Sequence, residues 1–346
     1  MQKIKTALCS FGMSGWVFHA PFINAHEGFE LYGVWERTKN LAQEKYPSIK
    51  TFRDLDVMLA DDSIDLVVVN TPSITHFEYT KKALLAGKHV IVEKPFTATV
   101  AEAQELINLA KEKNKQLSVF HNRRWDSDFL TVKKIIESGA IGTVKEAEIH
   151  FDRFTPALSH KAHKEVNTPA VGVVYDLGAH VIDAALQLFG MPTAVFGDMM
   201  IMRENSVVDD YFEILLYYPA FRVRLKATMF AKEPQGFIIH GTKGSFIKSR
   251  GDVQEPQLVQ HKNPLDADYG VEPEEEWGTL DAEKNGVFIK EKIRSERGNY
   301  LNYYNGIYNA IANNQPLPVS APQAQNVIKI IEAAYGSANS KKVTAV

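Results

Sequence analysis

The chain has 346 residues, 45% of them hydrophobic and 23% charged, with a net charge of -3 at pH 7. This length suits two domains with separate cores, and the interspersed charges exclude a general attraction to nucleic acid or to an anionic membrane surface. The single cysteine, Cys9, excludes an intrachain disulfide and a cysteine-based metal cluster.

The beginning of the sequence, Met1–Lys5, leads directly into a short apolar run. The run is too short for the core of a signal peptide, and no stretch of the sequence approaches the length of a membrane span. We therefore expect a cytoplasmic protein without a membrane partner.

The first third of the chain alternates between strand and helix patterns. Strands are predicted at Ile4–Cys9, Glu30–Trp35, Ile64–Asn70, His89–Val92 and Gln116–Phe120, and helices at Thr38–Lys45, Asp54–Ala60, Thr75–Ala86 and Val100–Lys113. Gly12–Asn24 contains a turn followed by a helix start. This alternation predicts right-handed crossovers and a doubly wound parallel sheet, that is, a Rossmann domain at residues 1–122.

The pattern changes after residue 122. Helices are predicted at Phe129–Ser138, Val174–Phe189, Leu301–Ala312 and Gln323–Tyr335, and strands at Val144–Phe151, Ala194–Met202, Tyr211–Tyr217, Arg222–Met229 and Phe237–His240. The short link between the third and fourth of these strands favours an antiparallel hairpin. We expect residues 123–346 to form a C-terminal α+β domain, with a large, mostly antiparallel sheet and helices on one face. The polar segment Glu255–Gly286 is predicted to be an exposed excursion, and the terminal helix can pack back on the first domain.

The segment after the first predicted strand resembles a dinucleotide-binding turn. Ser10, Gly12, Met13, Ser14 and Gly15 nearly fit the fingerprint in which glycines let backbone N–H groups approach a pyrophosphate at a helix N-terminus. Ser10 stands at the position of the first glycine. The alternative interpretation is an ordinary turn between a strand and a helix.

The end of the second predicted strand is where the adenosine ribose of such a cofactor lies. Glu36 favours NAD, because a carboxylate accepts hydrogen bonds from a ribose 2′-OH, whereas Arg37 and Lys39 favour NADP, because a cation accommodates a 2′-phosphate. We expect either cofactor to be accepted. A charged surface turn is the alternative.

Two further strands end in tripeptides that suit a ligand site. Thr71 and Pro72 follow one strand, and Glu93 and Lys94 follow the next. Ligands bind beyond the carboxyl ends of strands in open α/β sheets, so we expect these residues, with the nearby His76, to lie at the cofactor. Lys94 can polarise a substrate hydroxyl, although a lysine at a strand end is usually solvated.

A polar run follows the next strand, which should end on the same edge of the sheet. Arg123, Arg124 and Trp125 lie in this run and can present hydrogen-bond donors to a substrate. A basic linker between domains is the alternative.

The predicted helix at Val174–Phe189 carries Asp176 and His180 four positions apart, on one helical face. A histidine with a pKa near neutrality is suited to removing a proton from an alcohol. A capping aspartate with a core histidine is the alternative. We expect no metal, because the sequence has no HExxH motif, second nearby histidine or cysteine set.

Together these segments resemble the Gfo/Idh/MocA oxidoreductase family over nearly the whole chain. The resemblance rests on the glycine turn Gly12–Gly15, the tripeptide Glu93–Lys94–Pro95, and Asp176 and His180 in a D-x-x-x-H helix. Residues Phe120–Thr131 look especially like the NADP-dependent scyllo-inositol 2-dehydrogenase branch. Ser10 and Glu36 depart from the family pattern.

The resemblance implies oxidation of a sugar or cyclic polyol, such as an inositol, or reduction of the matching ketone. It assigns the catalytic roles to Lys94, Asp176 and His180, with His180 taking the hydroxyl proton. Arg153 joins Arg123 and Arg124 as a candidate for contacts with substrate hydroxyls. NADP is slightly favoured by the resemblance, although Glu36 opposes it.

Two other functions remain open on the same fold. One is a non-catalytic NAD(P)-binding sensor or regulatory protein, since fold does not imply function. The other is a redox-neutral enzyme with tightly held NAD. A homo-oligomer that associates through the C-terminal sheet is expected in each case, because a sheet with one exposed face often buries that face in a partner.

Overall fold

The computed structural model describes residues 3–346, so Met1 and Gln2 of the predicted N-terminal segment lie outside the described residues. The chain divides into two compact units. The first comprises the described residues up to Asn122 with Gln254–Tyr269 and Asn299–Gln325, and the second comprises Arg123–Val253, Gly270–Gly298 and Asn326–Val346.

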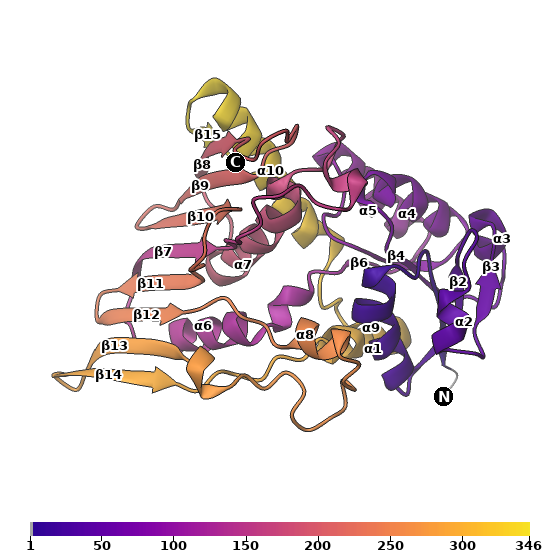
Figure 1. Cartoon of the computed structure of the whole chain (residues 1–346), viewed down its shortest axis with the longest axis horizontal. Coiled ribbons are helices and arrows are strands. Elements are labelled where there is room, and N and C mark those ends of the chain that lie inside the picture. The colour runs from indigo at the N-terminus through magenta and orange to yellow at the C-terminus, as the bar shows by residue number, and fades with distance from the viewer. Residues whose placement is uncertain (1–2) are drawn as a thin grey trace. The chain divides into compact units, whose positions relative to one another are not determined.

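In the described residues, the first unit contains a six-stranded sheet whose paired strands all run parallel (Figure 1). The order is β3-β2-β1-β4-β5-β6, with β1 at Ile4–Leu8, β2 at Phe29–Trp35, β3 at Lys50–Phe52, β4 at Leu66–Val69, β5 at His89–Val92 and β6 at Leu117–Val119. The predicted doubly wound parallel sheet is confirmed. Its switch point lies at the carboxyl ends of β1 and β4, where such sheets bind dinucleotides.

Short helices connect these strands. They are the π-helix η1 (Ser14–His19), α1 (Ala20–Ala25), α2 (Leu41–Lys45), α3 (Leu55–Leu59), the 3-10 turn η2 (Ser73–Thr75), α4 (His76–Leu85) and α5 (Val100–Glu112). Side chains set where some of them begin: Asp54 accepts the amide of Val57 at 3.0 Å at the start of α3, and Thr99 and Glu102 form a capping box at the start of α5.

Two segments later in the chain also belong to the first unit. One contains α8 (Gln254–Val259) and the other contains α9 (Leu301–Asn313). Tyr304 of α9 stacks on Phe22 with ring centroids 5.9 Å apart, and Tyr303 meets Phe120 edge-on at 4.9 Å. Both tyrosines are fully buried. These aromatic contacts explain why α9 groups with the first unit although it follows residue 122 by a long stretch of chain.

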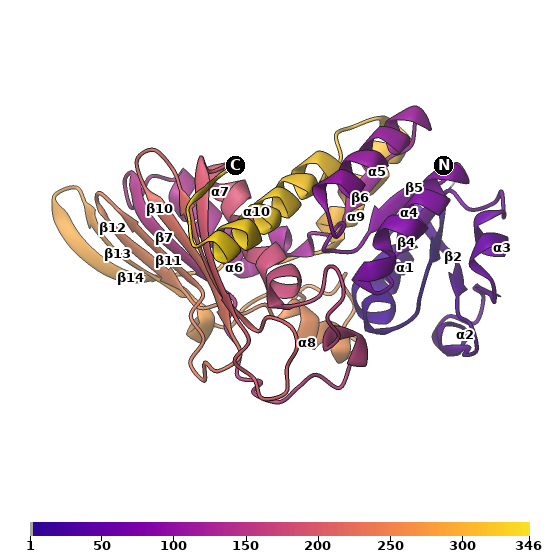
Figure 2. The ribbon, with the colours of Figure 1, turned by 90° about the horizontal axis from the view of Figure 1, so that it is seen from above.

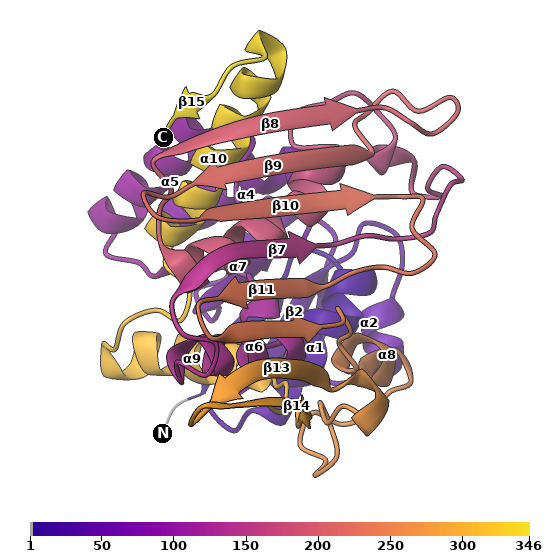
Figure 3. The same ribbon diagram turned by 90° about the vertical axis from the view of Figure 1, so that its left-hand side faces the viewer.

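The described part of the second unit contains a nine-stranded sheet of order β14-β13-β12-β11-β7-β10-β9-β8-β15 (Figure 3). The strands are β7 (Val144–His150), β8 (Ala194–Met200), β9 (Tyr211–Tyr217), β10 (Arg222–Thr228), β11 (Phe237–Gly241), β12 (Gly244–Lys248), β13 (Gly278–Lys284), β14 (Val287–Ile293) and β15 (Thr344–Ala345). The predicted mostly antiparallel sheet and the β9–β10 hairpin are confirmed. Only the pairing of β7 with β10 is parallel among the described strands of this sheet.

The prediction of an exposed excursion at Glu255–Gly286 was wrong in its second half. Residues Gly278–Lys284 form β13, which pairs with β12 on one side and β14 on the other. The alternation in β13 is carried by Leu280 and Ala282, which are buried, among polar neighbours. Because β13 and β14 are rich in charged residues, their polar composition masked this alternation.

Helices cover one face of the nine-stranded sheet (Figure 2). They are α6 (Ser127–Glu137), α7 (Ala179–Phe189), which continues the π-helix η5 (Val174–Gly178), and the second-unit part of α10 (Ala321–Ser340). Strand β9 shows the matching period of two, because Phe212, Ile214 and Leu216 are fully buried and the residues between them are partly exposed. The core of the unit therefore lies between this face and its helices.

Gly197 of β8, which faces α10, and Gly336, which is exposed on α10, should respond oppositely to alanine. A β-carbon at Gly197 would lie 2.5 Å from the carbonyl oxygen of Ala334, whereas one at Gly336 would meet no atom within 4 Å. We expect Gly197→Ala to destabilise the protein by about 1–3 kcal/mol, and Gly336→Ala to stabilise it by about 1 kcal/mol through helix propensity. Thermal unfolding of both variants checks this, and equal shifts of the same sign would contradict the close packing.

Candidate functional site

The turn after β1 has the shape that a dinucleotide pyrophosphate requires. A β-carbon at Gly15 would lie 2.5 Å from the carbonyl oxygen of Ser10, so the helix η1 approaches the end of β1 as closely as glycine allows. At Gly12, which is exposed, a β-carbon would meet no atom within 4 Å. The backbone at Gly12 is therefore open to a ligand just before a helix N-terminus, where anions bind favourably.

Ser10, which replaces the first glycine of the fingerprint, has a structural partner in Asn70. The Asn70 side chain accepts a hydrogen bond from the Ser10 amide at 2.9 Å and donates one to the Ser10 carbonyl at 2.9 Å. The Ser10 hydroxyl in turn donates to the Asn70 carbonyl at 2.8 Å. These bonds join the ends of β1 and β4, so the departure at Ser10 leaves the turn tightly held.

Glu93 lies at the end of β5 and is bound by the helix that follows the turn. Its Oε1 accepts the hydroxyl of Ser14 at 2.5 Å and lies 3.1 Å from Nε2 of His19, and its Oε2 accepts the Lys94 amide at 3.2 Å. Burial raises the pKa of Glu93, but the contacts with His19 and Ser14 outweigh it and lower the pKa to about 2. Glu93 is therefore an anion that ties η1 to β5.

His19 and Tyr304 complete this network and were missed by the sequence analysis. His19 is fully buried, with Nδ1 2.6 Å from the hydroxyl of Tyr304, and its ring lies 4.4 Å from that of Phe120. His19 lies on the helix of the turn, but Tyr304 comes from α9, far along the chain. No local pattern could have linked these two residues.

His76 ties together the segments that follow β4 and β5. One ring nitrogen lies 2.7 Å from the carbonyl oxygen of Pro95 and the other lies 2.9 Å from that of Thr71. Burial lowers the pKa of His76. The hydroxyl of Thr71 also lies 2.7 Å from that of Thr75. The structure thus places His76 where it supports the backbone at Thr71 and Pro95, and its expected contact with the cofactor remains a prediction.

Glu36 is buried at the end of β2, and its carboxylate caps α2. Its two oxygens accept the amides of Leu41 and Ala42, each at 3.2 Å. Arg37 and the next three residues are exposed. The structure therefore gives Glu36 a role in the fold and leaves Arg37 and Lys39 as exposed cations just after the end of β2.

Arg53 fixes the loop of residues 36–40 through hydrogen bonds of its guanidinium group. Its Nη1 donates to the carbonyls of Glu36 at 2.7 Å and Lys39 at 2.6 Å, and its Nη2 donates to the side chain of Asn40. Arg53 was not predicted from the sequence, because it lies after the short strand β3, which was itself missed.

In the second unit, Asp176 lies in η5 and His180 in the first turn of α7. Oδ2 of Asp176 accepts a hydrogen bond from Nζ of Lys164 at 2.6 Å, and the two side chains are 36% and 41% exposed. His180 is buried, and its ring centroid lies 5.8 Å from that of Phe151. Asp176 is thus reachable from solvent, whereas His180 lies against the sheet.

The predicted substrate arginines have different surroundings. Arg124 is buried and makes a two-pronged pair with Asp183, at 2.9 and 2.7 Å. Arg123 pairs with Asp126 at 3.0 Å. Burial, together with the nearby Asp252, raises the pKa of Asp126 well above its usual range. Arg124 therefore has a structural partner, whereas its role toward substrate remains a prediction.

Three arginine guanidinium groups lie over the ring of Phe151. Those of Arg123 and Arg153 lie 5.1 Å from its ring centroid and that of Arg250 lies 4.1 Å away, distances typical of cation–π contacts. Arg153 is exposed, and Trp125 is half-buried at the end of the 3-10 turn Asn122–Trp125. The second unit thus brings Arg123, Arg153 and His180 to one aromatic side chain.

Residues 3–346 contain neither a cluster of metal-ligating side chains nor a helix suited to span a membrane. None of these residues forms a group of three or more metal-ligating side chains. No helix in the same range has both the length and the apolar character that a membrane span requires.

The sequence matches one oxidoreductase family along most of its length. Residues 4–121 match the Gfo/Idh/MocA family's NAD-binding Rossmann fold, and residues 133–346 match its C-terminal alpha/beta domain. The chain is 41% identical to an uncharacterized oxidoreductase of Schizosaccharomyces pombe over 98% of either protein. It is 38% identical to scyllo-inositol 2-dehydrogenase (NADP(+)) IolW of Bacillus subtilis, covering 99% of this chain and 96% of that protein. The solved structure of yvaA from Bacillus subtilis has a TM-score of 0.96 at 36% identity, covering 100% of this chain and 99% of that one.

The open backbone at Gly12 predicts a selective loss of cofactor binding. Gly12→Val places a side chain where we expect the pyrophosphate to meet the backbone, while the fold has room for it. We expect a near-normal melting temperature and at least a tenfold weaker affinity for NADPH, measured by fluorescence titration. Gly15→Val is the contrasting variant, which should unfold because of the contact with Ser10. Near-normal cofactor affinity in folded Gly12→Val would remove this turn from the site.

Because Glu36 caps α2, replacing its carboxylate should change both the stability of the protein and its choice of cofactor. Glu36→Gln leaves one amide of α2 without its acceptor, which should destabilise the protein by about 1–3 kcal/mol. Loss of the negative charge near Arg37 should raise the affinity for NADPH relative to NADH. Glu44→Gln, on the exposed side of α2, is the control with the same charge change. An unchanged affinity ratio in Glu36→Gln would limit Glu36 to its role in the fold.

Proposed function

Because the chain belongs to the Gfo/Idh/MocA oxidoreductase family, we propose that it transfers hydride between a nicotinamide cofactor and a carbinol carbon of a sugar or cyclic polyol. The proposal is carried by three side chains suited to proton chemistry, Lys94, Asp176 and His180, in a chain with a turn shaped for a dinucleotide. A cofactor sensor would need none of the three. An inositol is the first candidate substrate, since the relative IolW is named for one.

The proposed chemistry divides proton handling among the three residues. His180 accepts the proton of the substrate hydroxyl, and Lys94 donates a hydrogen bond to the same oxygen. Asp176 accepts a hydrogen bond from substrate and so orients it. The bound nicotinamide supplies the hydride acceptor, and in the reverse direction the donor. The residues thus provide general acid–base catalysis and orientation.

For the cofactor, we propose that NADP is accepted through Arg37, with substantial use of NAD. Arg37 is exposed at the end of β2, and the loop that carries it is held by the contacts of Arg53. The buried Glu36 adds a negative charge beside this loop, which opposes a 2′-phosphate. We also propose a homo-oligomer through the face of the nine-stranded sheet that its own helices leave uncovered (Figure 3).

A panel of cyclic polyols and sugars, each offered with NAD and with NADP, tests the proposed function. We expect at least one cyclic polyol to give reduced nicotinamide, read by its absorbance. Absence of turnover with every compound and both cofactors, in a preparation that binds NADPH, would favour a sensor instead.

His180→Ala tests the assignment of the base. General acid–base catalysis contributes about 10²–10⁴-fold, so we expect a loss of that order in kcat with unchanged NADPH affinity. His240→Ala, in β11, is the control on the same unit and should keep its turnover. If His180 is only a core residue, its variant will have a lower melting temperature but nearly normal kcat per folded molecule.

Lys94→Ala extends the test to the coupling between the two groups. We expect a severe loss of kcat, and the double variant with His180→Ala should lose less than the product of the two single losses. This follows because both groups would act on one oxygen, and such residues are not additive. Strictly multiplicative losses would contradict a shared target.

A further inference from the structure

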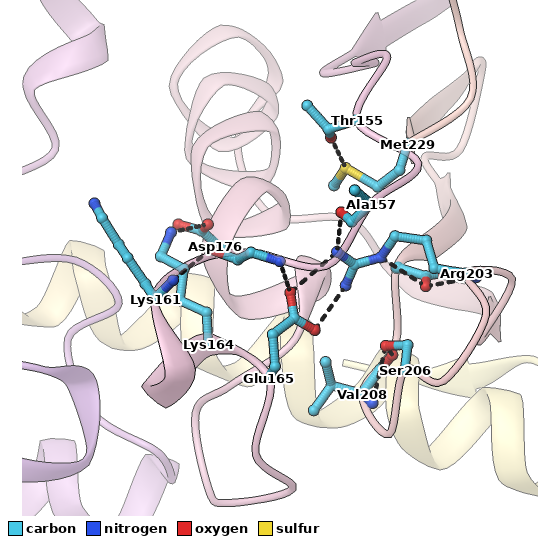
Figure 4. A network of polar contacts seen from close by, with 12 residues as sticks. Thr155, Ala157, Lys161, Lys164, Glu165, Asp176, Arg203, Ser206, Val208 and Met229 are labelled. Carbon is cyan, nitrogen blue, oxygen red and sulfur yellow. Dashed lines mark hydrogen bonds and ion pairs between the residues drawn. The ribbon is translucent and has the colours of Figure 1, made fainter.

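The segment between β7 and η5 carries a lysine that bonds to the proposed substrate residue Asp176. Most of residues 153–169 are exposed, and the 3-10 turn η4 (Ala162–Lys164) lies within them. Figure 4 shows Lys164 reaching Asp176 from this segment, with the adjacent Glu165 turned toward Arg203. The two neighbouring side chains therefore connect to different parts of the second unit.

Glu165 anchors the segment through a shielded pair. Its two oxygens accept hydrogen bonds from Arg203 at 3.0 and 3.1 Å, and Nε of Arg203 donates to Asp210 at 3.0 Å. The side chains of Glu165 and Arg203 are 12% and 9% exposed. Arg203 also donates to the carbonyl of Ala157 at 3.3 Å, and Glu165 accepts the amide of Ser159 at 2.7 Å. The backbone beside Lys164 is thus fixed from several directions.

The pair of Lys164 and Asp176 differs from this anchor in its exposure. Its atoms are only 2.6 Å apart, yet 41% of the Lys164 side chain and 36% of that of Asp176 remain exposed. Ion pairs with this exposure contribute little to stability, about 0–1 kcal/mol. The pair differs from other surface pairs because it contains Asp176, the residue proposed to bind substrate.

An ammonium beside a carboxylate complements a hydroxyl group. Lys164 has three N–H donors and no acceptor, whereas an ionised Asp176 only accepts. A hydroxyl can donate to Asp176 and accept from Lys164 at the same time. Because the two charges are opposite, the pair favours a neutral ligand over one that carries a carboxylate or an amine.

We propose that Lys164 is a specificity-determining residue, which together with Asp176 binds a hydroxyl on the carbon next to the reacting carbinol. The substrate class is therefore a neutral polyol with vicinal hydroxyls. This proposal rests on the proposed function, in which Asp176 faces the substrate. Lys164 binds and orients substrate, while proton transfer remains with His180.

The test compares two substrates in three lysine variants. The substrates are the cyclic polyol with the highest kcat/KM in the panel and its monodeoxy analogue, which lacks the hydroxyl next to the oxidised carbon. Lys164→Met removes the charge and Lys164→Arg keeps it. Lys161→Met is the control, because Lys161 lies on the same segment and points away from Asp176 in Figure 4.

We expect Lys164→Met to lower kcat/KM for the polyol about 10–100-fold, mostly through KM, since a hydrogen bond to a charged group is lost. The same variant should leave kcat/KM for the deoxy analogue within about threefold of the wild type. Lys164→Arg should recover most of the loss, and Lys161→Met should behave as the wild type. Melting temperatures should agree among all variants, because the pair contributes little to stability.

Three outcomes would overturn the proposal. Equal kcat/KM of wild type and Lys164→Met on the polyol would show that Lys164 does not bind substrate. An equal loss on the polyol and on its deoxy analogue would show that Lys164 acts on something other than the neighbouring hydroxyl. A wild-type enzyme without activity on any polyol would instead refute the proposed function, and the proposal for Lys164 with it.

Discussion

At Gly15, the first helix of the nucleotide-binding unit approaches the end of β1 so closely that only a hydrogen atom fits on its α-carbon. A β-carbon there would lie 2.5 Å from the Ser10 carbonyl oxygen and 3.1 Å from the side-chain nitrogen of Asn70. The turn, the exchange of hydrogen bonds between Ser10 and Asn70, and the reach of Ser14 and His19 to Glu93 all require this approach. The contacts at the switch point of the sheet therefore depend on the close approach at Gly15.

The tripeptide Glu93–Lys94–Pro95 combines a carboxylate that holds the fold with a lysine proposed to meet substrate. Its carboxylate is held by Ser14 and His19, so it serves the structure of the unit, while the adjacent lysine is the residue proposed to meet substrate. A similar division occurs in the second unit, where Glu165 anchors a segment through Arg203 and its neighbour Lys164 reaches Asp176. In both places a mostly buried glutamate fixes the backbone next to a lysine. The flexible lysine side chain therefore extends from a defined position.

Patterns with a short period were predicted well from the sequence, because they depend on neighbours along the chain. Strand β5 was predicted at its observed bounds, and the β9–β10 hairpin followed from the short link between its strands. Strand β3, with three residues, is too short to show a period, and β13 was hidden by its charged residues. The site shows the same limit: the turn at Gly12 is a local motif, whereas the contact of His19 with Tyr304 joins residues distant in the chain.

The placement of β7 in the middle of its sheet has a consequence for how the second unit is completed. Its partners β10 and β11 both follow it by many residues, and β7 pairs in parallel with β10 and antiparallel with β11. During synthesis on the ribosome, β7 leaves the exit tunnel with both of its edges unpaired. Strand β10 can pair with one edge once residue 228 has emerged, and the other edge stays unpaired until β11 is complete at residue 241. Unpaired strand edges invite association with other chains, so the nascent second unit passes through a period in which it is prone to aggregation.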